Sequence, residues 1–301
     1  MDKEQQPLQE EKLRPTFFVR LRPFSFPSQF PGSPALPSQT LTRSIGHAPY
    51  ILLPILATTV WFGGLTALMM LWVDAGKPRY DPAVASIVFI SDIGGANEGL
   101  FLGICVVVII LYFSSVCVIR WLRWKGRLPE NIGRKEKIYG YLTIFFCFVG
   151  CAGLFVLAKW NCYDYPTVHW DGTLVFIIGV ALSAIFQTLE VWQLNKGHEE
   201  RKHLKRNTYF KLAIVAGDVI LATAFGATYM YCHGKATATN GHTSFQCDDV
   251  SSKAAILEWA IAYGLNLYFL TLAADLWPAW KSSQRFFGRA EFPEKKGRSE
   301  V

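Results

Sequence analysis

The chain has 301 residues, of which 51% are hydrophobic and only 18% are charged. Soluble globular domains carry about 25% charged residues, so this composition excludes a soluble globular protein. The formal net charge of +7 raises the question of nucleic-acid binding. We exclude nucleic acid as a partner, because the basic residues lie in tails and short loops between long apolar segments, where they act as topology signals.

Apolar segments, each long enough at about 20 residues to cross a bilayer, predict an all-α polytopic membrane protein. We expect a bundle of six transmembrane helices at 50–73, 100–119, 138–158, 172–193, 210–231 and 254–278. A further apolar stretch, 83–90, is too short to span the membrane, so we expect it at the interface or packed on the bundle. No sequence repeat relates the two halves, so the inverted-repeat signature of many transporters is not evident.

Lys and Arg are distributed very unevenly among the segments that connect the predicted spans. The two tails and the connections after the second and fourth spans hold 25 of the 30 Lys and Arg residues. Basic loops stay preferentially on the cytosolic side of a membrane. We therefore expect both termini in the cytosol and the connections after the first, third and fifth spans on the exoplasmic side.

Two tails are predicted to flank a transmembrane domain over 50–280. The segment 1–49 holds 8 of the 15 Pro residues and lacks apolar periodicity, so we expect a disordered, Pro-rich cytosolic tail. The chain opens on a polar stretch, so we expect no cleavable signal peptide. The segment 281–301 is predicted to be a basic cytosolic tail.

Polar residues gather just before the second predicted span, in the run from Ser91 to Glu98 around a Gly pair that permits a tight turn. In one interpretation this run is a loop whose Asp92 or Asn97 caps the second span. In the other it belongs to a polar pocket at the exoplasmic face, where carboxylates and a His could act as general acid and base. The residues of that candidate pocket are Ser91, Asp92, Asn97, Glu98, His169, Asp171 and Glu258.

Polar groups inside the spans form a second set of candidates, because an ionisable group there costs several kcal/mol unless it is paired or hydrated. They are Glu190, Asp218, Asn266 and Asp275. Glu190 and Asp275 lie near cytosolic ends, where the simplest interpretation pairs Glu190 with Lys196 or another basic loop residue and Asp275 with Lys281. Asp218 lies nearer the middle of the membrane and is either bonded to a neighbouring helix or functional.

Three cysteines lie in or beside the predicted exoplasmic loops, a compartment that permits disulfides. A Cys232–Cys247 or a Cys162–Cys247 bridge fits the sequence, which does not choose between them. No zinc-ligand spacing and no nucleotide-binding or hydrolase motif is present. We therefore assign no catalytic residue and expect no metal and no cofactor.

Three motifs resemble one known family. They are the run FISDIGGANEG at 89–99, the HWDG at 169–172 and the EW…YFLTLAADL pattern over 258–276. In this order they are similar to motifs of the Frag/DRAM/Sfk superfamily, whose module also forms the N-terminal part of the calcofluor-hypersensitivity proteins. The resemblance covers about 45–282 and implies six spans, in agreement with the apolar segments.

The resemblance also implies site residues. It places Ser91, Asp92, Glu98, His169 and Glu258 at positions that match the family pattern. Asn97 stands where many members have a Pro, so the local geometry of this run departs from theirs. None of these residues is an established catalytic residue of the whole family, and they remain a candidate site.

The chain looks most like the fungal suppressor-of-four-kinase branch of this family. That resemblance implies a non-enzymatic membrane protein that regulates membrane lipid organisation or phosphoinositide kinase recruitment at the plasma membrane. The implied partners are anionic or inositol lipids at the cytosolic face and a phosphatidylinositol 4-kinase complex. A basic cytosolic surface fits such partners, because each basic charge near an anionic membrane contributes up to about 1 kcal/mol.

Other branches of the family imply other functions. One alternative is a factor, enzyme or enzyme subunit, that remodels the lipid of GPI anchors in the Golgi or endoplasmic reticulum. A further alternative is an autophagy modulator of the lysosomal or vacuolar membrane. Transport of lipids or ions past Glu190, Asp218 and Asp275 is the remaining candidate.

Overall fold

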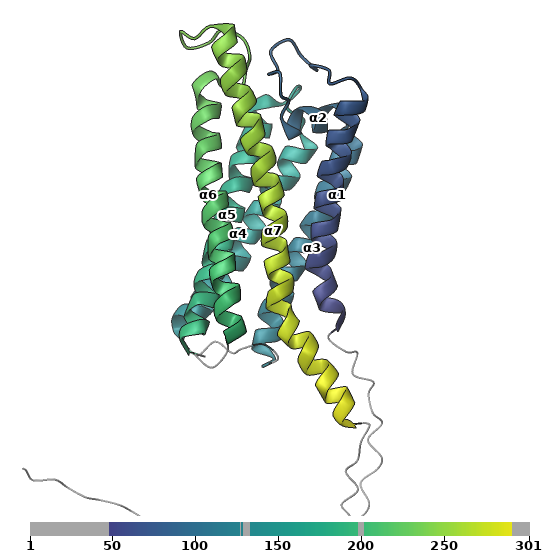
Figure 1. Cartoon of the computed structure of the whole chain (residues 1–301), viewed down its shortest axis with the longest axis vertical. Coiled ribbons are helices and arrows are strands. Elements are labelled where there is room, and N and C mark those ends of the chain that lie inside the picture. Colours follow the sequence, from purple (N-terminus) through teal and green to yellow (C-terminus); the bar gives the residue numbers. More distant parts are fainter. Residues whose placement is uncertain (1–47, 127, 129–132, 198–201, 291–301) are drawn as a thin grey trace, which may run out of the picture. The chain divides into compact units, whose positions relative to one another are not determined.

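The computed structural model describes residues 48–126, 128, 133–197 and 202–290, and over these residues the chain is a helical bundle (Figure 1). In chain order its elements are η1 (Ala48–Ile51), α1 (Leu52–Asp74), α2 (Ile90–Ala96), α3 (Glu98–Trp124), α4 (Arg134–Lys159), α5 (Pro166–Gly197), α6 (Lys202–Cys232) and α7 (Ser244–Ala290). The predicted all-α class is therefore confirmed.

Six of the described helices are long and apolar enough to cross a membrane. The spans are Leu52–Asp74, Glu98–Trp124, Arg134–Lys159, Pro166–Asn195, Lys205–Cys232 and Ser244–Ala279. Each of the six predicted spans overlaps one of these helices, which confirms a multi-pass integral membrane protein. The sidedness of the two ends is not shown by the fold and stays a prediction.

The long helices pack in a closed ring in the order α1, α3, α4, α5, α6, α7 and back to α1. The closest approach in the ring joins α4 to α5, where Gly150 faces Gly179 and Gly153 faces Gly172. A methyl group added to Gly150 would lie 2.8 Å from the backbone nitrogen of Val180. Small residues at these positions let the two backbones touch, which is how helices associate where lipid removes the hydrophobic driving force.

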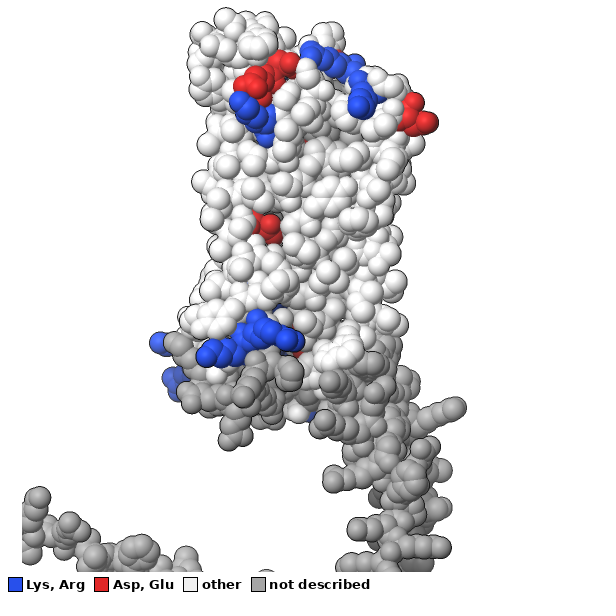
Figure 2. Space-filling model, in the orientation of Figure 1, with Lys and Arg blue, Asp and Glu red and all other residues white. Residues whose placement is uncertain are grey.

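The outer surface of the bundle is apolar. Large side chains that remain exposed around it include Phe62, Ile110, Phe148, Ile178 and Ile220. Figure 2 shows a broad uncharged belt between two charged ends, interrupted by an acidic patch about midway. Such a belt is what a surface in contact with hydrocarbon requires.

The short helix α2 corrects the prediction of a loop before the second span. The stretch 83–90 packs on the bundle, which was one of the two positions expected for it. Helix α2 continues directly from this stretch. Gly94 and Gly95 lie inside this helix and make no turn. Gly94 instead gives close packing, since an added methyl would lie 2.7 Å from the ring of Phe101.

Helix α7 is much longer than the span predicted at 254–278. It begins at Ser244, because Thr243 and Gln246 cap it reciprocally: Thr243 N donates to Gln246 Oε1 (3.0 Å) and Gln246 N to Thr243 Oγ1 (3.3 Å). It continues past Pro278 to Ala290, into the segment predicted as a tail. The remainder of both predicted tails, 1–47 and 291–301, lies outside the described residues.

Candidate functional site

The ring of helices encloses an elongated cavity of about 120 Å³ next to α2. All seven α-helices contribute side chains to its wall. Most of these side chains are apolar, and the polar exceptions are Ser91, His169, Thr173, Asp218, Glu258 and Tyr268. Along α6 the wall runs from Val215 to Phe225, which at 1.5 Å per residue is about 15 Å along the bundle.

Two carboxylates of the predicted pocket hold the first turn of α2. Glu258 Oε2 of α7 accepts a hydrogen bond from Ile90 N at 2.7 Å. Asp92 Oδ2 accepts one from Phe89 N at 3.0 Å. The first N–H groups of a helix have no partner within the helix, so these carboxylates supply the missing acceptors. Asp92 thus caps α2 from within, and Glu258 fixes α2 on the bundle.

Two side chains in the connection between α4 and α5 contact the backbone of α2. Cys162 Sγ lies 3.3 Å from Ser91 O, and Tyr163 OH donates to Asp92 O at 3.1 Å. Burial raises the pKa of Asp92 to about 6, because desolvation outweighs the stabilising hydrogen bond from Phe89 N. Burial and the nearby Asp92 charge also raise the pKa of the Cys162 thiol, which is not bonded to another cysteine.

His169, which opens the predicted fourth span, lies in α5 and is buried against the cavity wall. Its Nδ1 lies 2.9 Å from Trp160 O, which orients the ring. Ser91 and Glu258 line the same cavity. The structure therefore brings three residues of the predicted pocket together.

The other residues of the predicted pocket do not line this cavity, although Glu98 lies at a second, small hollow beside Ser91 and His169. Asp171 is exposed on α5, and Glu98 is exposed and accepts a hydrogen bond from Asn161 at the surface. Asn97 Nδ2 donates to Ile93 O (3.0 Å), so its side chain does not cap the second span. The capping carboxylate, Asp92, serves α2 itself, because the run folds as a helix.

Glu190 is buried at the opposite end of the bundle from α2. Its Oε1 lies 3.2 Å from Arg120 Nη1 and 3.8 Å from Arg123 Nε, both on α3. Of the two partners considered from the sequence, Glu190 thus pairs with basic residues that were assigned to the connection after the second span. The side chain of Lys196, the other partner considered, lies outside the described residues. Gly140 makes room for the pair, since an added methyl would lie 2.9 Å from Arg120 Cζ.

Asp275 forms a buried salt bridge with Lys211 of α6. Asn207 Nδ2 also donates to Asp275 Oδ1 at 2.5 Å. The sequence interpretation counted Lys211 among the topology signals and so missed this role. Lys281, the predicted partner, has a side chain outside the described set. The signal available in the sequence was that Lys211 and Asp275 both lie within about a turn and a half of the same end of the bundle.

Asp218 and Asn266 are the remaining intramembrane candidates. Asp218 stands at the middle of the span Lys205–Cys232 and lines the cavity. Its carboxylate lies against Gly264 of α7 and makes no hydrogen bond or salt bridge with any residue that the structure describes. The side-chain amide of Asn266 is buried, and neither its nitrogen nor its oxygen has a partner among those residues.

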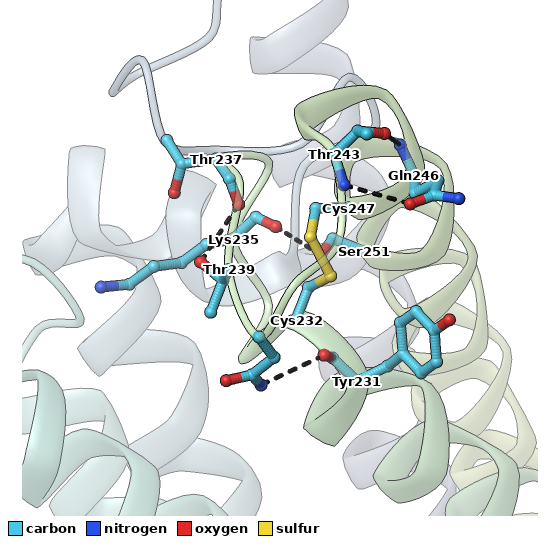
Figure 3. Close-up of a disulfide and its surroundings, with 10 residues drawn as sticks. Tyr231, Cys232, Lys235, Thr237, Thr239, Thr243, Gln246, Cys247 and Ser251 are labelled. Atoms are coloured by element: carbon cyan, nitrogen blue, oxygen red, sulfur yellow. Dashed lines mark hydrogen bonds between the residues drawn. A yellow bond between two sulfur atoms is a disulfide. The ribbon is translucent and has the colours of Figure 1, made fainter.

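Figure 3 shows the disulfide, which joins Cys232 at the end of α6 to Cys247 in the first turns of α7. Of the two pairings that the sequence allowed, this is the one that forms. Ser251 Oγ donates to Lys235 O (3.0 Å) beside it. The bridge thus ties the end of α6 to the capped start of α7.

The candidate site offers no evident metal centre. Within the described ranges, no group of three His, Cys, Asp or Glu side chains could hold a metal ion. The chemistry that the arrangement can perform is hydrogen bonding from a few polar groups in the wall of a largely apolar chamber.

Comparison with known proteins gives two findings. The model of the Frag1/DRAM/Sfk1/Cwh43P N-terminal domain matches residues 49–279. Protein sfk1 of Schizosaccharomyces pombe is 27% identical over 234 residues, which cover 76% of this chain and 64% of that relative. The chain therefore spans less than two thirds of the relative's length. No solved structure matches it.

Proposed function

The chain belongs to the Frag1/DRAM/Sfk1/Cwh43P N-terminal domain family, and from this premise we propose that it is a non-enzymatic regulator of membrane lipid organisation. The proposal places it in the plasma membrane. There its basic cytosolic segments would attract anionic or inositol lipids and favour recruitment of a phosphatidylinositol 4-kinase complex.

One observation carries the non-enzymatic part of this proposal. Each of the two best acid–base candidates, Asp92 and Glu258, uses one carboxylate oxygen to accept from a backbone N–H at the start of α2. A general acid or base must reach the proton that it transfers. Carboxylates that bind α2 are positioned for structure, and the chamber beneath them is apolar, as suits contact with lipid.

The test is made in cells that normally express the protein. The chromosomal copy is deleted and replaced by the wild type, by E258Q, or by a variant in which the Lys and Arg residues of 281–301 are changed to Gln. A fluorescent phosphatidylinositol 4-phosphate sensor and annexin binding to surface phosphatidylserine report lipid organisation. A C-terminal tag reports whether the protein lies at the plasma membrane.

We expect deletion to change both lipid readouts, E258Q to restore them and the neutralised tail to restore them poorly. Gln keeps an oxygen that can accept from Ile90 N, so E258Q retains α2 while it removes any acid–base function. Restoration by the neutralised tail as complete as by the wild type, or a deletion without effect on either readout, would contradict the proposal.

GPI-anchor lipid remodelling is the second candidate, because Ser91, His169 and Glu258 line one cavity. It makes the opposite prediction for E258Q. If that variant is present at wild-type level but the anchor lipids resemble those of the deletion, the enzymatic alternative replaces the regulator. Location in the Golgi or endoplasmic reticulum would point the same way.

A further inference from the structure

We propose that the central cavity binds one phosphate-free membrane lipid whose polar end donates hydrogen bonds through a hydroxyl group. The hydrocarbon part lies in the apolar chamber, and the hydroxyl meets the acceptors of Glu258 or Asp218. The inference deepens the proposed function and rests on it only in taking the ligand from the surrounding membrane.

The form of the cavity favours a hydrocarbon chain. It extends about 15 Å along α6, yet its volume of about 120 Å³ leaves it narrow. On α5 its wall runs from His169 to Ala184, and on α7 from Glu258 to Tyr268. Apolar cavities of this size bind hydrophobic molecules in preference to water. A narrow, apolar chamber of this volume takes only part of a lipid, a section of one chain or one edge of a ring system, while the rest of the molecule stays in the surrounding membrane.

The charge of the wall decides the class of polar group. Two carboxylates, those of Asp218 and Glu258, line the cavity, and no Lys or Arg of the described residues does so. The buried Lys211 lies outside the lining and is bound to Asp275. A lipid phosphate would therefore find no counter-ion in the wall, which disfavours phospholipids.

Each of the two carboxyl groups in the wall has an oxygen that accepts no hydrogen bond from a described residue. Glu258 uses Oε2 for Ile90 N, and its other oxygen accepts no hydrogen bond from a described residue. Asp218 has no partner there at all, although it stands at the middle of the membrane. Leaving such groups unpaired in hydrocarbon costs several kcal/mol. A ligand hydroxyl satisfies an acceptor without adding a second buried charge.

The experiment uses the purified full-length protein in lipid nanodiscs and three photoreactive, alkyne-tagged probes. Two are phosphate-free, a diacylglycerol and a sterol, and the third is a phosphatidic acid with the same chains as the diacylglycerol. Cross-linked peptides are located by mass spectrometry. The diacylglycerol and the phosphatidic acid differ only in the phosphate, so their comparison isolates the head group.

Two pairs of variants test the site. Ala181→Trp on α5 and Ala222→Trp on α6 fill the cavity, whereas Ile178→Trp and Ile220→Trp place the same side chain on the outer surface of the same helices. Asp218→Ala adds no bulk and removes the acceptor, so it remains informative if a Trp variant does not fold.

We expect at least one phosphate-free probe to label the cavity wall about tenfold more than phosphatidic acid does, a difference of 1.4 kcal/mol. The cavity-filling variants and Asp218→Ala lose most of this labelling, while the outer variants keep it. Equal labelling by phosphatidic acid, labelling only of outward-facing residues, or unchanged labelling of both cavity-filling variants and Asp218→Ala overturns the proposal. If neither phosphate-free probe labels the wall while deletion still alters cellular lipids, this inference fails and the proposed function stands.

Discussion

The salt bridge between Lys211 and Asp275 places two charges inside the bundle, where neither reaches water. The side chain of Lys211 is fully buried, and that of Asp275 is 4% exposed. Taking charges out of water is expensive, and their mutual attraction offsets that expense only while both are present. These two residues therefore fix the register of α6 against α7 more than they add to the free energy of unfolding.

We predict that Asp275→Asn or Lys211→Met alone destabilises the protein by about 3–5 kcal/mol, because each leaves one buried charge without a partner. The double variant Lys211→Met/Asp275→Leu should recover most of that loss. Chemical unfolding in detergent, followed by the signal of tryptophan fluorescence, measures both effects. The matched control is Lys253→Met, which removes an exposed pair with Asp249 and should change little. Single variants as stable as the control would contradict this reading.

Asp92 makes the stability of the α2 region depend on pH. Its pKa is about 6 in the fold against an ordinary 3.8, because burial penalises the charged form. The folded state thus binds the proton more tightly than the unfolded chain. The resulting stabilisation is complete below about pH 4 and is lost as the pH rises through about 6.

We predict that this single group lowers the free energy of unfolding by up to about 3 kcal/mol between pH 4 and pH 7. Asp92→Asn removes the charge and keeps an acceptor for Phe89 N, so its stability should depend less on pH. Thermal unfolding in detergent across this pH range, with exposed Asp249→Asn as the control, measures the difference. Parallel pH curves for the wild type and Asp92→Asn would show that the Asp92 charge is not responsible.

At the level of elements, the close packing of α4 against α5 requires glycines at the contact, and the composition does not show which glycines these are. We predict that Gly150→Ala destabilises the protein by about 1–3 kcal/mol, since the methyl group overlaps the backbone of α5. Gly103→Ala on α3 is the matched control, because nothing lies within 4 Å of its added methyl. There the gain in helix propensity should dominate. Unfolding in detergent compares the two, and equal effects would contradict close backbone packing.

An element was predicted well when local sequence determines it, and poorly when contacts with distant parts of the chain stabilise it. The six spans were found because a run of about 20 apolar residues is a local property. Helix α2 was missed because its first turn is capped by Glu258, which comes from a distant part of the chain. The polar start of α7 read as a loop, although Thr243 and Gln246 carry the spacing of a capping box.

The candidate site was predicted only in part for a similar reason. Equal depth in the membrane was the ground for placing Ser91, His169 and Glu258 in one candidate pocket, and the three residues line one cavity. The sequence does not show which face of a helix points inward when apolar residues occupy all of its faces. The prediction therefore missed that Asp171 lies on the outer face of α5. The salt bridge between Asp275 and Lys211 was missed for the same reason, because it depends on which faces of α6 and α7 meet.

For the whole molecule, the two ends of the bundle differ in chemistry. The Cys232–Cys247 disulfide and α2 lie at one end, and the basic residues at the end of α3 and the start of α4, such as Arg123 and Arg134, lie at the other. Disulfides form in oxidising compartments, which agrees with the expectation that the α2 end is exoplasmic. The positive-inside distribution and the disulfide are independent arguments for one orientation, which stays a prediction.

Helix α7 connects these two ends without interruption. Its 47 residues extend about 70 Å, more than twice the thickness of the hydrocarbon core. Figure 1 shows that its C-terminal part bends away from the ring, and Pro278, which cannot donate a backbone hydrogen bond, lies within it. Because α7 lines the cavity at Glu258 and continues past Pro278, a change in its tilt at the cavity would also move the far end of the helix, and Pro278 is the point at which the two parts can bend relative to each other.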